Sequence, residues 1–174
     1  DHLSAESGSN HSFGLNLQKE FGLRLEEAAI YCVSSSNDDI LMWGHYADSH
    51  KGICLEFDSR SDFLRPALEV RYEVLRPKVS LFNHPSTLEN MENSLLVKSR
   101  QWEYEKEWRV VQFKNPPGLR KFNDGDLTGV IFGSAISESM QNTISNILTS
   151  HSTPINLYKA TPDDYEFKMK IDKI

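Results

Sequence analysis

Apolar residues recur at every second position, or in short unbroken runs, in seven segments of the chain, and turn residues bound most of them. This pattern is typical of β-strands with one or both faces buried. The run at Glu107–Phe113 is the strongest, and Tyr165–Ile171 alternates most regularly. The predicted strands are Ala28–Ser34, Ile53–Phe57, Leu68–Tyr72, Glu107–Phe113, Leu127–Phe132, Pro154–Ala160 and Tyr165–Ile171.

Three further segments repeat their apolar residues at helical spacing, which predicts amphipathic helices over Asp39–Asp48, Ser86–Ser99 and Ser137–Ser150. The serine-rich run before Asp39 offers several N-caps. In the last helix, the spacing predicts that four apolar residues face the core: Met140, Ile144, Ile147 and Leu148. A fourth, short helix is expected to end near Gly22.

These elements predict an α+β fold with a mixed, mainly antiparallel sheet and three or four helices. Residues 1–12 are polar and serine-rich, which indicates a flexible segment, and 13–174 form one expected domain. Strands and helices do not alternate regularly, and no glycine-rich phosphate loop follows a strand. The sequence therefore argues against dinucleotide-binding folds of the Rossmann type and against P-loop enzymes.

Composition narrows the class of protein further. The 174 residues are 39% hydrophobic and 25% charged, as expected of a soluble globular domain. A formal net charge of −6 argues against broad nucleic-acid binding, and no apolar run is long enough for a membrane helix. Cys32 and Cys54 lie in strand-like runs, which predicts two buried thiols in a reducing, cytoplasmic compartment. No clustered Cys and His spacing indicates a metal.

Two glutamates are the strongest candidates for catalysis. Glu105 and Glu107 stand two positions apart in WEYEKEWR, where a strand is predicted to begin. One carboxylate could stabilise an oxocarbenium-like centre while the other activates a nucleophile. The alternative is that both are strand-edge charges paired with Lys106 and Arg109. Arg109 itself could bind phosphate, or pair with Glu107 or Glu103.

The segment before the second strand adds candidate binding residues. Ser34 and Ser36 leave a strand and could hydrogen-bond a ligand, or cap the helix that follows. Trp43 could stack on a flat ligand or anchor the core. His45 and Tyr46 stand on the same helix, where a single histidine is either a base or a structural residue.

The runs MWGHYADSHKGICLEFD and KSRQWEYEKEWRVV resemble a bacterial family known as domain of unknown function 2971. This resemblance extends from Tyr31 to about Ile155, and the family name implies no activity. The order of a serine-ended strand, a short helix, a strand and an ExE motif also resembles ADP-ribosyltransferases of the arginine-serine-glutamate type. That second resemblance implies an ADP-ribosyltransferase-like fold.

The ADP-ribosyltransferase resemblance also implies roles for individual residues. Ser34 and Ser36 would shape an NAD site, with Trp43 or Tyr46 stacking on nicotinamide. Glu107 would be the catalytic glutamate that holds the ribose, and Glu105 would direct the acceptor. His45 and Arg109 complete the expected cofactor-binding set.

Three hypotheses follow. The first is an NAD-dependent ADP-ribosyltransferase-like or NAD-cleaving domain, with NAD as substrate, no metal, and protein, nucleic acid or water as acceptor. The second is a non-catalytic ligand- or protein-binding module, which predicts no NAD consumption and a fully buried Glu107 paired with Arg109. The third is a hydrolase or nuclease that uses His45, the glutamates and a divalent ion.

Overall fold

The computed structural model describes residues 16, 19–23, 25–78, 87–113 and 118–174. The chain gathers into two compact units. Unit 1 comprises Asp1–Val33, Ala67–Glu103 and Glu107–Leu119, and unit 2 comprises Ser34–Pro66, Tyr104–Lys106 and Arg120–Ile174. Neither unit is a continuous stretch of sequence. A single domain over 13–174 stays a prediction, and the flexible segment 1–12 lies outside the described residues.

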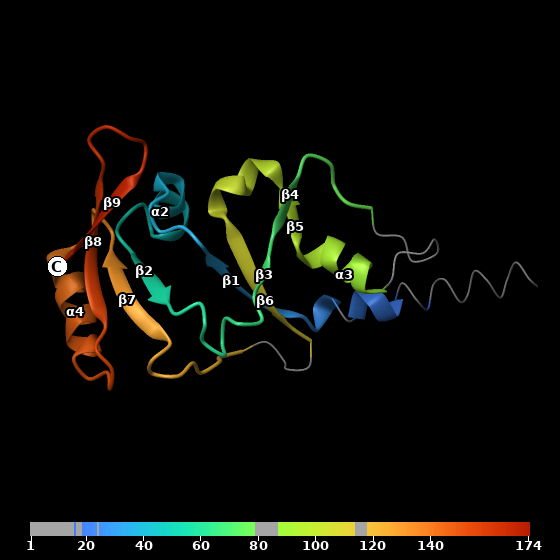
Figure 1. Ribbon diagram of the computed structural model, residues 1–174, viewed down its shortest axis with the longest axis horizontal. Helices are drawn as coiled ribbons and strands as arrows, with labels where there is room; N and C mark the ends of the chain where they lie inside the picture. Colours follow the sequence, from blue (N-terminus) through green and yellow to red (C-terminus); the bar gives the residue numbers. More distant parts are fainter. Residues whose placement is uncertain (1–15, 17–18, 24, 79–86, 114–117) are drawn as a thin grey trace, which may run out of the picture. The chain divides into compact units, whose positions relative to one another are not determined.

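Unit 1 contains two small sheets (Figure 1). The first has the order β1–β6–β3 and the second pairs β4 with β5 in parallel. Helical residues at 19–23 and 25–26 precede β1, and the 3-10 helix η1 leads into β6. The elements of unit 1 are β1 (Ala29–Ser34), β3 (Leu68–Glu69), β4 (Arg71–Glu73), α3 (Thr87–Leu95), β5 (Val97–Ser99), η1 (Arg100–Glu105) and β6 (Glu107–Gln112). The last residue of β1, Ser34, and the last two of η1, Tyr104 and Glu105, belong to unit 2.

The strand predicted over Leu68–Tyr72 is in fact two short strands in different sheets. The N–H group of Val70 donates to the carbonyl of Glu107, whereas the N–H group of Arg71 donates to the carbonyl of Leu96. The chain changes partner at Val70, which is 2% exposed, while Leu68 is 50% exposed. The alternating pattern failed here because it cannot show which neighbouring strand supplies the hydrogen bonds.

The helix predicted over Ser86–Ser99 is too long. α3 ends at Leu95, and Val97–Ser99 is the strand β5, so Lys98 lies on a strand. A guanidinium nitrogen of Arg109 donates to the carbonyl of Leu95, which satisfies a backbone group that the next helical turn would use. β4 then pairs with the residues beyond. Tertiary partners therefore end the helix earlier than its sequence pattern indicates.

Unit 2 is a four-stranded sheet between two helices (Figure 1). Its strands have the order β2 (Ile53–Phe57), β7 (Leu127–Phe132), β8 (Asn156–Pro162) and β9 (Met169–Lys173). The β2–β7 and β8–β9 pairs are antiparallel. β7 and β8 are parallel because the helix α4 (Glu138–Leu148) connects them. The second helix is α2 (Ile40–Tyr46), with Asp39 as its N-cap.

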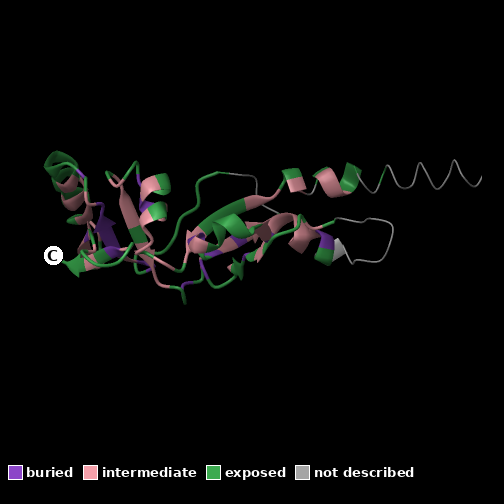
Figure 2. Ribbon diagram, turned by 90° about the horizontal axis from the view of Figure 1, so that it is seen from above, coloured by how far each residue is buried: buried purple, intermediate pink, exposed green. Residues whose placement is uncertain are grey.

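Alternation along β7 builds the two halves of the core of unit 2. Ile131 packs with Trp43 of α2 and with Met169, whereas Val130 and Phe132 form a second cluster with residues of α4. Ile131 and Phe132 have no exposed surface. Figure 2 shows purple, buried residues within this sheet. A strand covered on both faces is apolar along its whole length. The continuous hydrophobic run at Leu127–Phe132 therefore predicted the bounds of β7 correctly.

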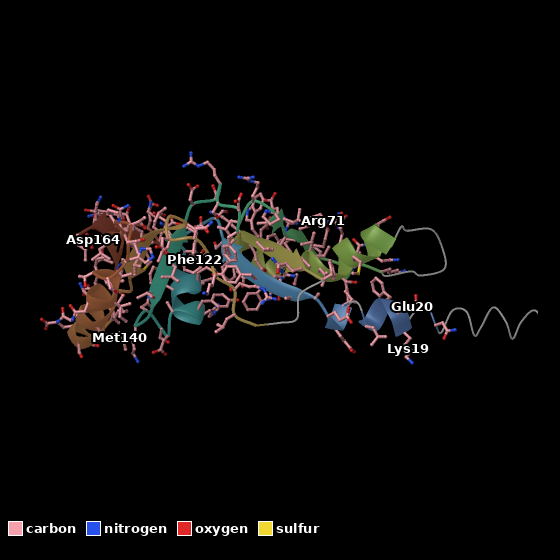
Figure 3. All side chains as sticks on the ribbon, turned by 90° about the horizontal axis from the view of Figure 1, so that it is seen from below. Lys19, Glu20, Arg71, Phe122, Met140 and Asp164 are labelled. Carbon is pink, nitrogen blue, oxygen red and sulfur yellow. The ribbon has the colours of Figure 1, made fainter. Side chains whose placement is uncertain are left out.

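Four predicted core residues of unit 2 divide into two pairs. Ile144 and Leu148 pack inward, as predicted. Met140, labelled in Figure 3, and Ile147 do not, because they are 52% and 64% exposed. The apolar face predicted for this helix was too wide, because of the four residues only Ile144 and Leu148 pack against the core.

The strand predicted over Tyr165–Ile171 begins only at Met169. Tyr165 and Phe167 are 96% and 98% exposed. The carboxylate of Asp163 accepts hydrogen bonds from the N–H groups of Tyr165 and Glu166, so the chain turns here instead of extending. The alternation of the sequence is real, but its first half has no partner strand among the described residues.

The predicted α+β class with mostly antiparallel sheets is confirmed, although the described strands form three sheets and not one. An ADP-ribosyltransferase-like architecture stays a prediction. Cys32 was predicted to be buried and is exposed, and both cysteines are free thiols. Within the described ranges, no helix is both long enough and apolar enough to cross a membrane.

Candidate functional site

The serines at the end of β1 are bound to the backbone of the ExE motif. The hydroxyl of Ser34 donates to the carbonyl of Glu105 at 2.6 Å and accepts from the N–H group of Ser36 at 3.0 Å. The N–H group of Ser35 donates to the carbonyl of Lys106 at 3.1 Å. The Ser36 hydroxyl donates to Oδ1 of Asp38. The structure thus brings the serines to residues 105–106, while Asp39 provides the helix cap.

The two glutamates of the ExE motif lie in different elements. Glu105 ends η1, Glu107 opens β6, and Lys106 between them has a φ of 44°. This left-handed residue turns the backbone from helix to strand. Glu105 belongs to unit 2, where Tyr46 donates to its carboxylate, and Glu107 belongs to unit 1, where Arg109 donates to its carboxylate.

Glu105 is a buried carboxylate beneath an exposed tyrosine. It is 3% exposed, and the hydroxyl of Tyr46 donates to its Oε1 at 2.7 Å. Tyr46 itself is 62% exposed. Its ring is therefore open to solvent while its hydroxyl is held by a buried acceptor, which fixes the direction of the side chain.

His45 and Tyr104 extend this exposed aromatic group. The Tyr104 hydroxyl lies 3.1 Å from Nδ1 of His45. The His45 ring centroid is 6.3 Å from that of Tyr46 and 6.3 Å from that of Tyr104. We call His45, Tyr46, Tyr104 and Glu105 the aromatic cluster. Its members come from α2 and η1, which the Tyr46–Glu105 and Tyr104–His45 contacts join.

Trp43 lies in the core and not in the aromatic cluster. It is 3% exposed, and its indole N–H donates to the carbonyl of Asn37 at 2.7 Å. Of the two residues predicted to stack on nicotinamide, Tyr46 has an accessible ring and Trp43 does not.

Glu107 is 6% exposed and forms ion pairs with two cations of unit 1. Arg109 donates from Nε to Oε1 at 2.8 Å and from Nη2 to Oε2 at 3.0 Å. Nζ of Lys98 lies 3.0 Å from Oε2. Burial alone would raise the pKa of Glu107, but hydrogen bonds from Arg109, Cys32 and Lys98 outweigh it and lower the pKa to about 2. The carboxylate is therefore ionised at neutral pH.

Cys32 and Tyr72 complete the surroundings of Glu107. The N–H group of Glu107 donates to the Tyr72 hydroxyl at 2.8 Å. Cys32 is exposed as a residue, but neighbouring protein atoms partly desolvate its thiol. This desolvation and the hydrogen bond to Glu107 raise the pKa of Cys32 to about 11. We call Cys32, Lys98, Glu107 and Arg109 the ion cluster. Lys98 also lies over the ring of Trp102, 5.3 Å from its centroid.

The predicted site residues thus fall into two groups. Unit 2 holds Ser34, Ser36, Trp43, His45, Tyr46 and Glu105, and unit 1 holds Glu107 and Arg109. One pocket formed by all of them stays a prediction. Sequence reasoning missed Tyr104, Tyr72 and the link from Cys32 to Glu107. No local pattern marks these residues, because each contact joins positions far apart in the chain.

The turn between α2 and β2 was also missed. Asp48, Ser49 and His50 have φ values of 46°, 52° and 67°, an unusual succession of left-handed residues without glycine. Nδ1 of His50 is buried with no hydrogen-bond partner among the described residues. In the same ranges, no three His, Cys, Asp or Glu side chains are grouped as metal ligands would be.

A comparison with protein families finds a match in the central part of the chain. Residues 42–110 match the family "Protein of unknown function (DUF2971)". The DUF2971 match begins in α2 and ends in β6, so it includes both clusters except Cys32 and leaves Ser34 and Ser36 outside. The family description names no activity. No curated protein and no solved structure matches the chain.

Proposed function

We propose that this chain is a non-catalytic ligand- or protein-binding module. In this proposal the aromatic cluster is the recognition surface, and Glu107 has a structural role. The single observation that supports it most is the burial of Glu107 between Arg109 and Lys98.

The ion cluster favours a structural role for physical reasons. A catalytic carboxylate needs an oxygen that can face the substrate. Both oxygens of Glu107 already accept charge-assisted hydrogen bonds, and 6% of the residue is exposed. Two adjacent cations also neutralise the negative charge that would stabilise an oxocarbenium ion. Releasing the carboxylate would break two ion pairs that lie largely out of solvent, which is costly.

The aromatic cluster has the properties of a recognition surface. Tyrosine provides a large contact area at a low cost in conformational entropy, and it is enriched where proteins bind partners. The Tyr46 ring is exposed, and its hydroxyl is fixed by the buried Glu105. Such preorganisation reduces the entropic cost of binding.

The first test is NAD turnover by the purified chain, with Glu107→Gln as the variant and Glu103→Gln as its control. Glu103 is a side chain on η1 that is 61% exposed and pairs with Arg100. The proposal expects no nicotinamide release from any of the three proteins, together with a loss of stability in Glu107→Gln alone. Nicotinamide release by the wild type would overturn it.

A second candidate is the NAD-dependent ADP-ribosyltransferase-like domain. The hydrogen bond from Ser34 to the Glu105 carbonyl favours it, because it joins the serine-ended strand to the ExE motif. In this candidate Glu107 would hold the ribose and Glu105 would direct the acceptor. Ser34, Ser36, His45, Tyr46 and Arg109 would bind NAD without a metal, and the acceptor would be protein, nucleic acid or water.

The second candidate expects nicotinamide release that is lost in Glu107→Gln while circular dichroism reports an intact fold. Release that is unchanged in Glu107→Gln would remove Glu107 from the reaction. Under either candidate, the two free thiols fit a reducing compartment such as a bacterial cytoplasm.

A further inference from the structure

The loop between β8 and β9 presents two aromatic rings to solvent. Tyr165 is 96% exposed and Phe167 is 98% exposed. They continue the alternation of Met169, which is buried, and Ile171, which packs against the core. Tyr165 and Phe167 therefore extend the apolar face of β9 into the loop. No described residue covers this part of the face. Exposed apolar groups of this kind mark interaction sites.

Hydrogen bonds close this loop, which we call the acidic tip (163–168). Asp163 accepts from two N–H groups of the loop through its carboxylate, and its own N–H donates to the Lys168 carbonyl at 3.0 Å. Lys168 pairs with Glu166 at 2.7 Å. The loop that carries the two rings is thus closed by its own hydrogen bonds and by one ion pair. The tip contains three acids and one lysine, and one of these acids, Asp164, is labelled in Figure 3.

A segment of unit 1 has the complementary composition, and we call it the basic segment (71–78). Val74 and Leu75 are 75% and 81% exposed. Around them the sequence RYEVLRPK places three basic residues and one acid, and Arg71 is labelled in Figure 3. An exposed aliphatic pair with a basic rim matches an exposed aromatic pair with an acidic rim in both polarity and charge.

We propose that the chain associates with a second copy of itself, with the acidic tip of each copy bound to the basic segment of the other. In a twofold dimer this contact forms twice, because each copy supplies both surfaces. Burial of Tyr165 and Phe167 against Val74 and Leu75 provides the apolar core of the contact. The opposite charges set its orientation.

The size of the two surfaces sets the expected affinity. Each consists of one short segment, so the interface falls at the small end of specific protein interfaces. Association in the micromolar range is expected, and it should weaken as salt is raised because the charges lie at an exposed rim.

Sedimentation equilibrium of the full chain, from micromolar to near-millimolar concentration, tests this proposal. The tip variant is Tyr165→Ser with Phe167→Ser, and the segment variant is Val74→Ser with Leu75→Ser. Leu119→Ser is the matched control, since Leu119 is 101% exposed and lies in neither surface. Each variant should raise the dissociation constant about tenfold or more, and the control should not change it.

A mixture of the two variants gives the decisive measurement. The tip variant keeps an intact basic segment, and the segment variant keeps an intact tip, so the mixture retains one of the two contacts. It should associate more strongly than either variant alone. A wild type that stays monomeric throughout, or a mixture no stronger than its components, would overturn the proposal. So would monomeric wild type that binds phosphatidylcholine vesicles through Tyr165 and Phe167, because the tip would then be a membrane contact.

Discussion

The hydroxyl of Tyr46 donates a 2.7 Å hydrogen bond to Oε1 of Glu105, and this bond joins an exposed ring to a buried carboxylate. The two residues are 59 positions apart in the sequence. The contact holds the η1 carboxylate that is buried, and it orients the Tyr46 side chain, which is 62% exposed. Loss of the hydroxyl should therefore affect both stability and recognition.

Tyr46→Phe should destabilise the protein by about 1–3 kcal/mol, because the buried Glu105 carboxylate loses a donor and cannot regain one from water. Tyr165→Phe is the matched control, since Tyr165 is 96% exposed and its hydroxyl faces solvent. Urea unfolding followed by circular dichroism measures both changes. Equal midpoints for the two variants would show that the Tyr46 bond contributes nothing.

Glu107→Gln should destabilise the protein by about 3–5 kcal/mol, because it removes the buried negative charge that forms ion pairs with Lys98 and Arg109. The side chains of Lys98 and Arg109 are 24% and 16% exposed. Glu103→Gln should cost less than about 1 kcal/mol, as expected for an exposed ion pair. If both substitutions changed the free energy of unfolding equally, burial of the ion cluster would not be the source of stability.

Acid should remove the contribution of Glu107 to the free energy of unfolding over a defined pH range. Its pKa falls from an ordinary value of 4.5 to about 2 on folding, so the folded state binds the proton less tightly. The stabilisation, about 3 kcal/mol, is present above about pH 5 and is lost as the pH falls toward 2. The difference in unfolding free energy between wild type and Glu107→Gln should therefore shrink over that range. A difference that stays constant from pH 6 to about pH 2.5 would contradict this pKa.

Cys32 should react slowly with iodoacetamide although it is exposed. Its pKa is raised to about 11, so little thiolate is present at pH 8, and alkylation should be about tenfold or more slower than that of a free thiol. Glu107→Gln should accelerate the reaction several-fold, because it removes the acceptor and the negative charge while Lys98 and Arg109 remain. The rates are measured in a Cys54→Ser background. A rate unaffected by Glu107→Gln would rule out this coupling.

Gly133→Ala should destabilise unit 2 by about 3 kcal/mol or more, because overpacking against backbone cannot relax by side-chain rotation. A Cβ at Gly133 would lie 2.1 Å from the carbonyl oxygen of His50 and 2.9 Å from that of Gly52. Gly125→Ala is the control, since a Cβ there would meet nothing within 4 Å. Thermal unfolding compares the two variants. Wild-type stability in Gly133→Ala would show that the turn at His50 is free to move.

The elements of unit 2 were the most predictable part of the fold. The bounds of β2 and β7 agree with the hydrophobic runs, and α4, with Ser137 as its N-cap, lies within the predicted range Ser137–Ser150. These features depend on local spacing and on capping chemistry. The predictions for 68–72 and 86–99 were wrong because the chain there changes partner within a few residues. Hydrogen-bond partners from other segments decided where those elements end.

The sequence by itself determined which residues became candidates for a site: the serines after a strand, the aromatic helix and the paired glutamates are all visible in it. Only the tertiary structure decided their environments. It joined Glu105 to Tyr46 and surrounded Glu107 with Arg109 and Lys98. The reason is physical: two carboxylates two positions apart are equivalent in a local pattern, but a left-handed Lys106 directs them to different elements. Partners distant in the sequence then determine the burial and charge of each.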